Sequence, residues 1–202
     1  MALFSYEELK QKTNYLYNSK SYDNSLRMGL LSESSSININ SISQDSFDIF
    51  LSHSYADREI IPALKNELES YGFSVYVDWI TDKLLSRDEI NKKTAEVLQT
   101  RMKQSKCLIY ATSDNSQKSR WMPWELGYFD GIKDKMVGIL PLKKYGNNFN
   151  DNFKGEEYLG LYYYIDKEKN QLNEMRLWVR ENQDKYVLLN SWITGEKPYV
   201  RK

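Results

Sequence analysis

The sequence is poor in residues that stabilise small folds through cross-links or metal ions. Its 202 residues include one cysteine, Cys107, and one histidine, His53. A single cysteine cannot form an internal disulfide, and one thiol with one imidazole provides too few ligands for a structural zinc site. The sequence therefore excludes disulfide-rich and zinc-stabilised folds, and we expect no bound metal.

Long hydrophobic runs are also missing. The longest apolar runs, such as 107–111, are far shorter than the about 20 residues that a membrane-spanning helix needs. The polar N-terminus lacks the apolar segment of a signal peptide. We therefore expect a cytoplasmic protein with no membrane contact.

The chain has no excess of either charge, with 28 basic and 28 acidic residues, so no overall field attracts nucleic acid. The segment from residue 143 onward does hold 11 of the 28 aromatic residues, together with 11 basic and 9 acidic ones. Interleaved aromatic and basic side chains can stack nucleobases. However, the consecutive tyrosines 162–164 lie in a strand-like run and must point to both faces. We therefore predict a packed extension and no nucleic-acid partner.

Common catalytic motifs are absent too. The sequence contains neither type of glycine-rich phosphate loop and no G-x-S-x-G nucleophile elbow. Hydrolysis of nucleoside triphosphates and serine-hydrolase chemistry therefore lack their usual sequence support.

The N-terminal region, residues 1–45, is predicted to hold one helix and a linker. Ser5 followed by Glu8 has the spacing of a capping box, and the positions after it have helical spacing: Leu9, Thr13 and Leu16. Between residues 32 and 46, nine of fifteen residues are Ser or Asn, which is typical of a solvated linker. We place the domain boundary near residue 45.

From residue 46 the pattern predicts an α/β domain with parallel strands covered by helices, because short apolar runs alternate with amphipathic stretches. The expected strands are 47–51, 73–77, 107–111 and 136–140. The expected helical faces are Ile60, Leu64, Leu68 and Tyr71, ended by Gly72, and Ile90, Thr94, Val97, Leu98 and Met102. A C-terminal extension, 143–202, is expected to complete the fold with an edge strand at 158–165 and a helix at 171–182. The apolar face of that helix would consist of Leu172, Met175 and Val179.

Two places in the chain are candidates for chemistry. His53 lies between two serines directly after the first strand, where it could touch a ligand or be an ordinary loop residue. Pro123 requires a helix that begins near residue 119 or 120, which puts Glu125 close to the helix N-terminus and on one face with Trp121 and Tyr128. Such a carboxylate suits a developing sugar cation. By spacing alone, the better interpretation is that Trp121 and Trp124 are core residues and that Glu125 is a favourable acid in the first helical turn.

Four segments in order resemble a bacterial Toll/interleukin-1 receptor (TIR) domain: 47–54 (FDIFLSHS), 72–79 (GFSVYVDW), 105–113 (SKCLIYATS) and 121–125 (WMPWE). The resemblance covers about residues 46–142. It implies the flavodoxin-like TIR fold, a parallel sheet flanked by helices.

The resemblance also implies an enzyme that cleaves the nicotinamide–ribose bond of NAD+, its substrate, without a further cofactor. The catalytic residue would be Glu125, four positions after Trp121, and Trp121 would bind the substrate by stacking on it. Two loops would border the substrate, and their residues are Ser52, His53, Ser54 and Tyr55 in the first, and Asp78, Trp79 and the positions through Ile90 in the second. The product would be ADP-ribose or a cyclised or conjugated derivative.

The same resemblance implies a biological setting. Enzymes of this kind serve antiphage defence of the Thoeris type, in which the nucleotide product would act on a downstream effector. The loop from Trp79 to Ile90 would support self-association, with Trp79, Leu84 and Leu85 expected to be exposed among charged residues. Two alternatives stay open: a non-catalytic TIR module that works by assembly, and an enzyme similar to nucleoside deoxyribosyltransferases.

Overall fold

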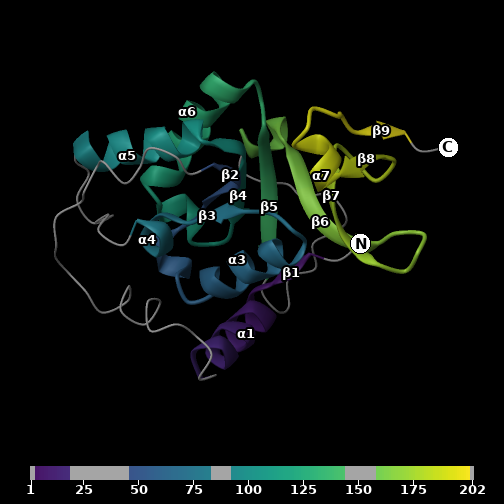
Figure 1. Ribbon diagram of the computed structural model, residues 1–202, viewed down its shortest axis with the longest axis horizontal. Helices are drawn as coiled ribbons and strands as arrows, with labels where there is room; N and C mark the ends of the chain where they lie inside the picture. The colour runs from purple at the N-terminus through teal and green to yellow at the C-terminus, as the bar shows by residue number, and fades with distance from the viewer. Residues whose placement is uncertain (1–2, 19–45, 83–91, 144–157, 201–202) are drawn as a thin grey trace.

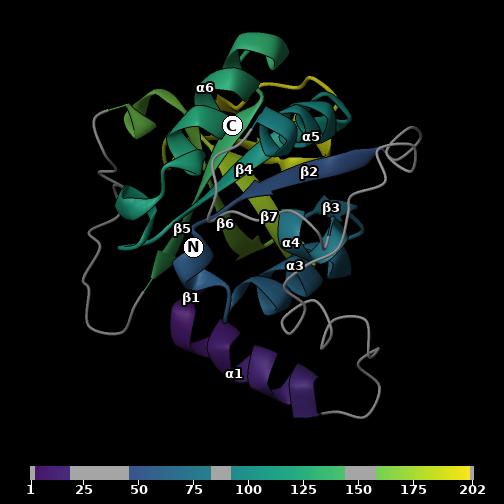
Figure 2. The same ribbon diagram turned by 90° about the vertical axis from the view of Figure 1, so that its left-hand side faces the viewer.

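The computed structural model describes residues 3–18, 46–82, 92–143 and 158–200. Their strands form one sheet with helices on both faces (Figures 1 and 2). The strand order is β3-β2-β4-β5-β6-β7-β8-β9, and β1 pairs with β5 outside this path. This architecture confirms the predicted α/β class. The strands are β1 (Phe4–Ser5), β2 (Phe47–Ser52), β3 (Val75–Tyr76), β4 (Ser105–Thr112), β5 (Val137–Lys143), β6 (Tyr163–Lys169), β7 (Met175–Arg180), β8 (Lys185–Leu188) and β9 (Tyr199–Val200).

The part of the sheet from β3 to β6 is parallel throughout. Along β2, Ile49 and Leu51 join one core cluster while Phe50 joins the other, as the two-residue period of a strand buried on both faces requires. Because these strands share one direction, their carboxyl ends lie at one edge of the sheet. Open α/β sheets bind ligands at that edge.

The helices cover the two faces in pairs. In Figure 1, α5 and α6 lie on one side of the sheet, and α3 with α1 on the other. The helices are α1 (Tyr6–Asn18), α3 (Ile61–Ser70), α4 (Asp78–Thr81), α5 (Lys92–Lys103), α6 (Trp121–Lys133) and α7 (Leu189–Trp192), and the short 3-10 turns are η2 (Tyr55–Asp57), η3 (Ser116–Lys118) and η4 (Leu159–Leu161).

Local signals explain where several helices begin and end. The backbone N–H of Glu8 donates to Oγ of Ser5 over 3.3 Å, which confirms the predicted N-terminus of α1, and Leu9 and Thr13 are buried. After α3, Gly72 adopts φ = +91°, a left-handed conformation that glycine reaches without a steric penalty.

The C-terminal region corrects two sequence predictions. The segment 158–165 is not an edge strand, because its first part forms η4 and β6 lies inside the sheet, between β5 and β7. The helix predicted over 171–182 is wrong, since this segment forms a turn followed by β7.

The physical reason for the second error lies in the turn. Leu172, counted as part of a buried helical face, is 77% exposed. The side chain of Asn170 accepts hydrogen bonds from the backbone N–H groups of Leu172 and Glu174, and Asn173 adopts φ = +62°. This local turn breaks a helix at its start, and the residues 177–179 that follow favour a strand.

Two further observations concern these described ranges alone. They contain no helix that is both long enough and apolar enough to cross a bilayer. They also contain no group of three acidic, histidine or cysteine side chains that could hold a metal ion.

Candidate functional site

The candidate site centres on a hydrogen bond between two buried residues at the carboxyl edge of the sheet. Oγ of Ser52, the last residue of β2, donates to Oε2 of Glu125 over 2.6 Å. Both side chains are fully buried. A hydroxyl that donates to a carboxylate stabilises its negative charge and limits its rotation. The two residues are 73 positions apart, so the fold alone brings them together.

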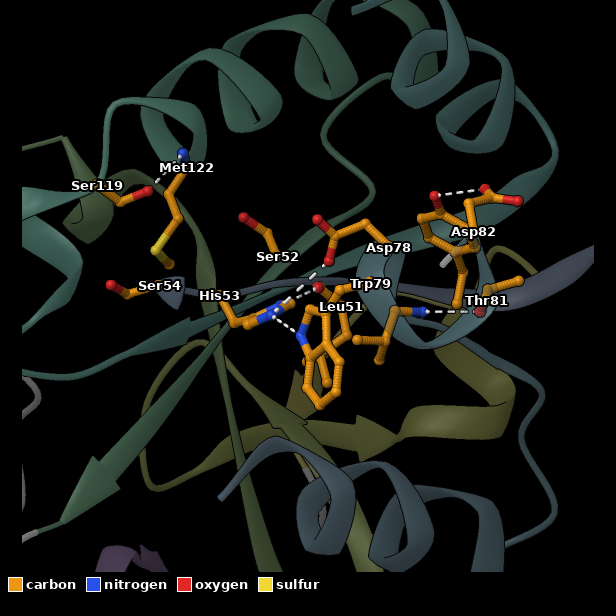
Figure 3. A network of polar contacts seen from close by, with 12 residues as sticks. Leu51, Ser52, His53, Ser54, Asp78, Trp79, Thr81, Asp82, Ser119 and Met122 are labelled. Carbon is orange, nitrogen blue, oxygen red and sulfur yellow. Dashed lines mark hydrogen bonds and ion pairs between the residues drawn. The ribbon is translucent and has the colours of Figure 1, made fainter. Parts of the chain in front are cut away.

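The start of α6 places Glu125. Arg120 is the residue before the helix, and Oγ of Ser119 accepts the backbone N–H of Met122 over 3.3 Å (Figure 3). Pro123 then lies in the first turn, where its missing N–H leaves no bond unmade. The predicted helix start is therefore correct within two residues, and Glu125 follows in the second turn.

Aromatic residues line α6 beside the carboxylate. Trp121 is buried one turn before Glu125 and meets Trp124 edge to face, with ring centres 5.4 Å apart. Trp124 in turn stacks on Tyr128 at 5.7 Å. Trp121 is thus a core residue that lies one helical turn from Glu125 on the same face of α6.

His53 is fully buried, and both of its ring nitrogens are bonded to the protein. Nδ1 lies 3.0 Å from the carbonyl oxygen of Leu51, and Nε2 accepts the indole N–H of Trp79 over 3.0 Å (Figure 3). Since Nε2 accepts a hydrogen bond, the proton must lie on Nδ1, which makes the ring neutral. In this structure His53 ties β2 to α4, and a direct contact with substrate stays a prediction.

Trp79 corrects a sequence expectation. It was expected to be exposed on a contact loop, but it lies in α4, is only 7% exposed and bonds to His53. The reason is that burial suits both parts of the side chain: the ring packs into the core cluster, and the indole N–H donates to Nε2 of His53. Ile90, the last predicted residue of this loop, lies outside the described residues.

The remaining predicted residues gather at the same edge. Asp78 begins α4 and is buried, with Oδ1 3.8 Å from Nε2 of His53 (Figure 3). Ser54 caps η2 by accepting the backbone N–H of Ala56, and Tyr55 is 45% exposed. The structure thus brings the predicted residues of the first loop close to those of α4, with Tyr55 facing solvent.

The sequence interpretation missed the anchor of α4. Two nitrogens of the buried Arg101 donate to the two carboxylate oxygens of Asp82, at 2.8 and 2.9 Å, and the hydroxyl of Tyr76 donates to Asp82 over 2.8 Å. Burial, together with the charges of Asp78 and Asp82, holds the pKa of Tyr76 well above its usual value, so the hydroxyl remains a donor. The only sequence signal was an arginine at the end of an amphipathic helix.

A second missed residue is Asp57, at the end of η2. It is fully buried, and its carboxylate accepts hydrogen bonds from Ser113 and Asn115 in the loop after β4. Its position shortly after a strand end was the available signal, but its partners are 56 and 58 positions away.

Comparison with known proteins supports the fold. Residues 49–177 match the family described as TIR domain, which confirms the resemblance carried by the four sequence segments and extends it through β6 into β7. A protein of Bacillus cereus (strain MSX-D12) named "Probable 3' cyclic ADP-D-ribose synthase ThsB'" is 50% identical over 149 residues, 73% of this chain and 75% of that protein. A protein of Cytobacillus dafuensis named "Putative cyclic ADP-D-ribose synthase TIR2" is 36% identical over 83 residues, 41% of this chain and 22% of that protein.

Proposed function

This chain belongs to the TIR domain family, and we propose on that basis that it cleaves the nicotinamide–ribose bond of NAD+ and closes the remaining nucleotide into a cyclic ADP-ribose. The observation that carries the proposal is the buried carboxylate of Glu125, held by Ser52 at the carboxyl edge of a parallel sheet. The names of these two relatives support the substrate class and the cyclic product.

The chemistry needs few protein groups. The bond that breaks joins the ribose C1′ to the nicotinamide nitrogen. Its electron pair leaves with nicotinamide, which departs neutral, so no general acid is required. Positive charge develops on the ribose, and the carboxylate of Glu125 stabilises it. The Ser52 hydroxyl holds that carboxylate in place.

The nucleophile decides the product. Attack of water on C1′, with loss of its proton to solvent, gives ADP-ribose. Attack of another hydroxyl or ring nitrogen of the same nucleotide, with loss of a proton where it carries one, gives a cyclic product. A wall of the site that excludes water and holds the nucleotide folded favours formation of the cyclic product. We assign this wall to Trp121, one helical turn from Glu125.

The substrate-bordering residues divide into two groups. Ser52, Ser54, Tyr55 and Asp78 are proposed to border NAD+ directly. His53 and Trp79 bond to each other and connect the end of β2 to α4, so we propose that they hold these four residues in place. All six lie in β2, α4 or the turn after β2, at the sheet edge where α/β folds bind nucleotides.

Incubation of the purified protein with NAD+, followed by chromatography and mass spectrometry, tests the proposal, with and without extract of phage-infected cells. We expect nicotinamide release and a cyclic product. Glu125→Gln keeps the side-chain shape and removes the charge, so turnover should fall by at least about 10²-fold. Glu96→Gln, which changes a surface carboxylate of α5, is the matched control and should keep wild-type turnover.

Other outcomes identify the alternatives. A folded Glu125→Gln variant with wild-type turnover would contradict the catalytic role. Release of base from deoxynucleosides but not of nicotinamide from NAD+ would indicate a deoxyribosyltransferase-like enzyme. No turnover under either condition would indicate an assembly module.

The wider biological role follows from the product. We propose that the nucleotide acts as a signal on a separate effector in antiphage defence and that the reaction takes place in the cytoplasm. Cell extracts that contain the product but not the enzyme should then be sufficient to activate the effector.

A further inference from the structure

Three side chains from two separate parts of the chain, the loop after β4 and helix α1, lie within hydrogen-bond reach of one buried carboxylate, that of Asp57. Nδ2 of Asn115 donates to Oδ1 over 2.5 Å, and Oγ of Ser113 donates to Oδ2 over 2.5 Å. The hydroxyl of Tyr6, in the N-terminal helix α1, lies 3.4 Å from Oδ1. All three donors are neutral. A buried carboxylate requires such donors, because an unsatisfied one would be strongly destabilising.

Asp57 joins the two segments that build the Ser52–Glu125 pair. It ends η2, which begins three residues after Ser52, the last residue of β2. Ser113 and Asn115 follow β4, the neighbouring parallel strand, and their loop leads through η3 into α6, which carries Glu125. A shift between these two loops would therefore change the alignment of Ser52 with Glu125.

The third donor comes from outside the region that matches the TIR family, which begins at residue 49. The hydroxyl of Tyr6 has a single proton, which it shares between Oδ1 of Asp57 at 3.4 Å and Oε1 of Glu59 at 3.1 Å, so it links two carboxylates that are two residues apart. Lys10 forms an ion pair with Glu59 at 2.9 Å. Burial and the neighbouring charges of Asp57 and Glu59 raise the pKa of Tyr6, so the hydroxyl keeps its proton.

The N-terminal segment is itself firmly attached. Phe4 of β1 is fully buried and pairs with Leu142 of β5. Leu9 of α1 lies in the same core cluster as Leu64 of α3. The segment can therefore act as a rigid support, because its backbone is bonded to the sheet and its helix is packed into the core.

We propose that Tyr6 and Asp57 are positioning residues of the NAD+-cleaving site, through which the N-terminal segment sets the two loops that align Ser52 with Glu125. The inference rests on the proposed function of Glu125. Its consequence is that a hydroxyl in an N-terminal appendage controls turnover without touching substrate.

The test uses the full chain and the variant Tyr6→Phe, which removes only the hydroxyl. Misplacement of a reacting group by about 1 Å can lower a rate by about 100-fold. We expect kcat for nicotinamide release to fall at least about fivefold, with KM within about twofold of wild type, because alignment with the transition state is lost while binding is kept.

The matched control is Tyr162→Phe. The hydroxyl of Tyr162 donates to Oδ2 of Asp130 over 3.0 Å, so this variant loses a hydrogen bond of the same chemistry elsewhere. It should lose a similar amount of thermal stability and keep kcat within about twofold. Glu59→Gln, which changes the other acceptor of Tyr6, should also keep kcat. A normal kcat in Tyr6→Phe, or equal losses in Tyr6→Phe and Tyr162→Phe, would overturn the proposal.

Asn115→Ala removes a different donor to the Asp57 carboxylate. It tests the positioning role even if Tyr6→Phe does not fold. Because both substitutions act through Asp57, their combined effect on kcat should be smaller than the product of the single effects. Independent, multiplicative effects would contradict a shared role.

Glu125→Gln separates failure of this inference from failure of the proposed function. If Glu125→Gln keeps wild-type turnover, the proposed function fails. If it is inactive while Tyr6→Phe has wild-type kcat, only the positioning role fails.

Discussion

The indole N–H of Trp79 donates to Nε2 of His53 over 3.0 Å, and this bond fixes the neutral, Nδ1-protonated form of a fully buried imidazole. The two residues connect the end of β2 to α4. His53 follows Ser52 directly in the chain, so the pair lies next to the hydrogen bond between Ser52 and Glu125.

Trp79→Phe should destabilise the protein and lower its turnover. The substitution keeps a smaller aromatic ring but removes the donor to His53, which should lower the free energy of unfolding by about 1–3 kcal/mol. Trp178→Phe is the control, because the indole N–H of Trp178 donates to the backbone oxygen of Glu168, also over 3.0 Å. Urea unfolding should show similar losses of stability in the two variants. The value of kcat/KM should fall only in Trp79→Phe. Equal turnover in the two variants would show that the His53–Trp79 pair does not serve the site.

Ser52→Ala should reduce turnover while the fold is kept. A hydrogen bond to a charged group contributes about 1.5–3 kcal/mol, so its loss should lower kcat by about 10- to 100-fold. Ser74→Ala is the control, since Ser74 donates to Asp48 over 2.9 Å at the start of β2 and not at its carboxyl end. Steady-state kinetics with circular dichroism distinguishes the two. Wild-type kcat in Ser52→Ala would mean that Glu125 is held by other contacts.

Trp121→Ala should shift the products from cyclic nucleotide towards free ADP-ribose as well as slow the reaction. Removal of the indole next to Glu125 should admit water and release the internal nucleophile. Trp124→Ala changes the partly exposed neighbour and should keep the product ratio. Chromatography of the reaction mixture measures both. A uniform loss of all products in Trp121→Ala would identify this residue as a structural anchor.

Ionisation of the Tyr162 hydroxyl should lower the free energy of unfolding at alkaline pH. Burial first, and then the hydrogen bond to Asp130 and its charge, raise the pKa of Tyr162 to about 12 from an ordinary 10.0. A raised pKa means that the folded protein holds this proton more tightly, so the contribution is complete below the unfolded pKa and is lost as the pH rises towards 12. Urea unfolding at about pH 9 and about pH 11 should show a larger loss in wild type than in Tyr162→Phe. Equal losses would mean that Tyr162 ionises normally in the folded protein.

The parallel half of the fold was predictable because its signals are local. Apolar runs marked β2 and β4, and Pro123 placed the start of α6 within two residues. The Asp57 cluster was not predictable, because its donors come from positions 51 to 58 residues away and each is an ordinary polar residue by itself. β7 was mistaken for a helix because three apolar residues had helical spacing, although the turn at Asn170 prevents a helix there.

The family resemblance implies self-association through the loop from Trp79 to Ile90, and the burial of Trp79 limits which side chains can contribute. Its indole is bonded within its own domain, so the contact must use later positions of the loop, where the sequence has Leu84 and Leu85 among charged residues. An apolar pair with charged neighbours is typical of a contact surface. A formal net charge of zero leaves little repulsion between copies.

We therefore expect activity per molecule to rise with protein concentration, and the double substitution Leu84→Asp with Leu85→Asp to lower it without a change in melting temperature. The control is Leu161→Asp with Leu172→Asp, since both of these leucines are 77% exposed and the added charge is the same. Activity assays over a wide dilution series, together with sedimentation of each variant, measure the effect. Constant specific activity and a fully active Leu84/Leu85 variant would show that a single chain contains the complete site, because no contribution from a neighbour would then be needed.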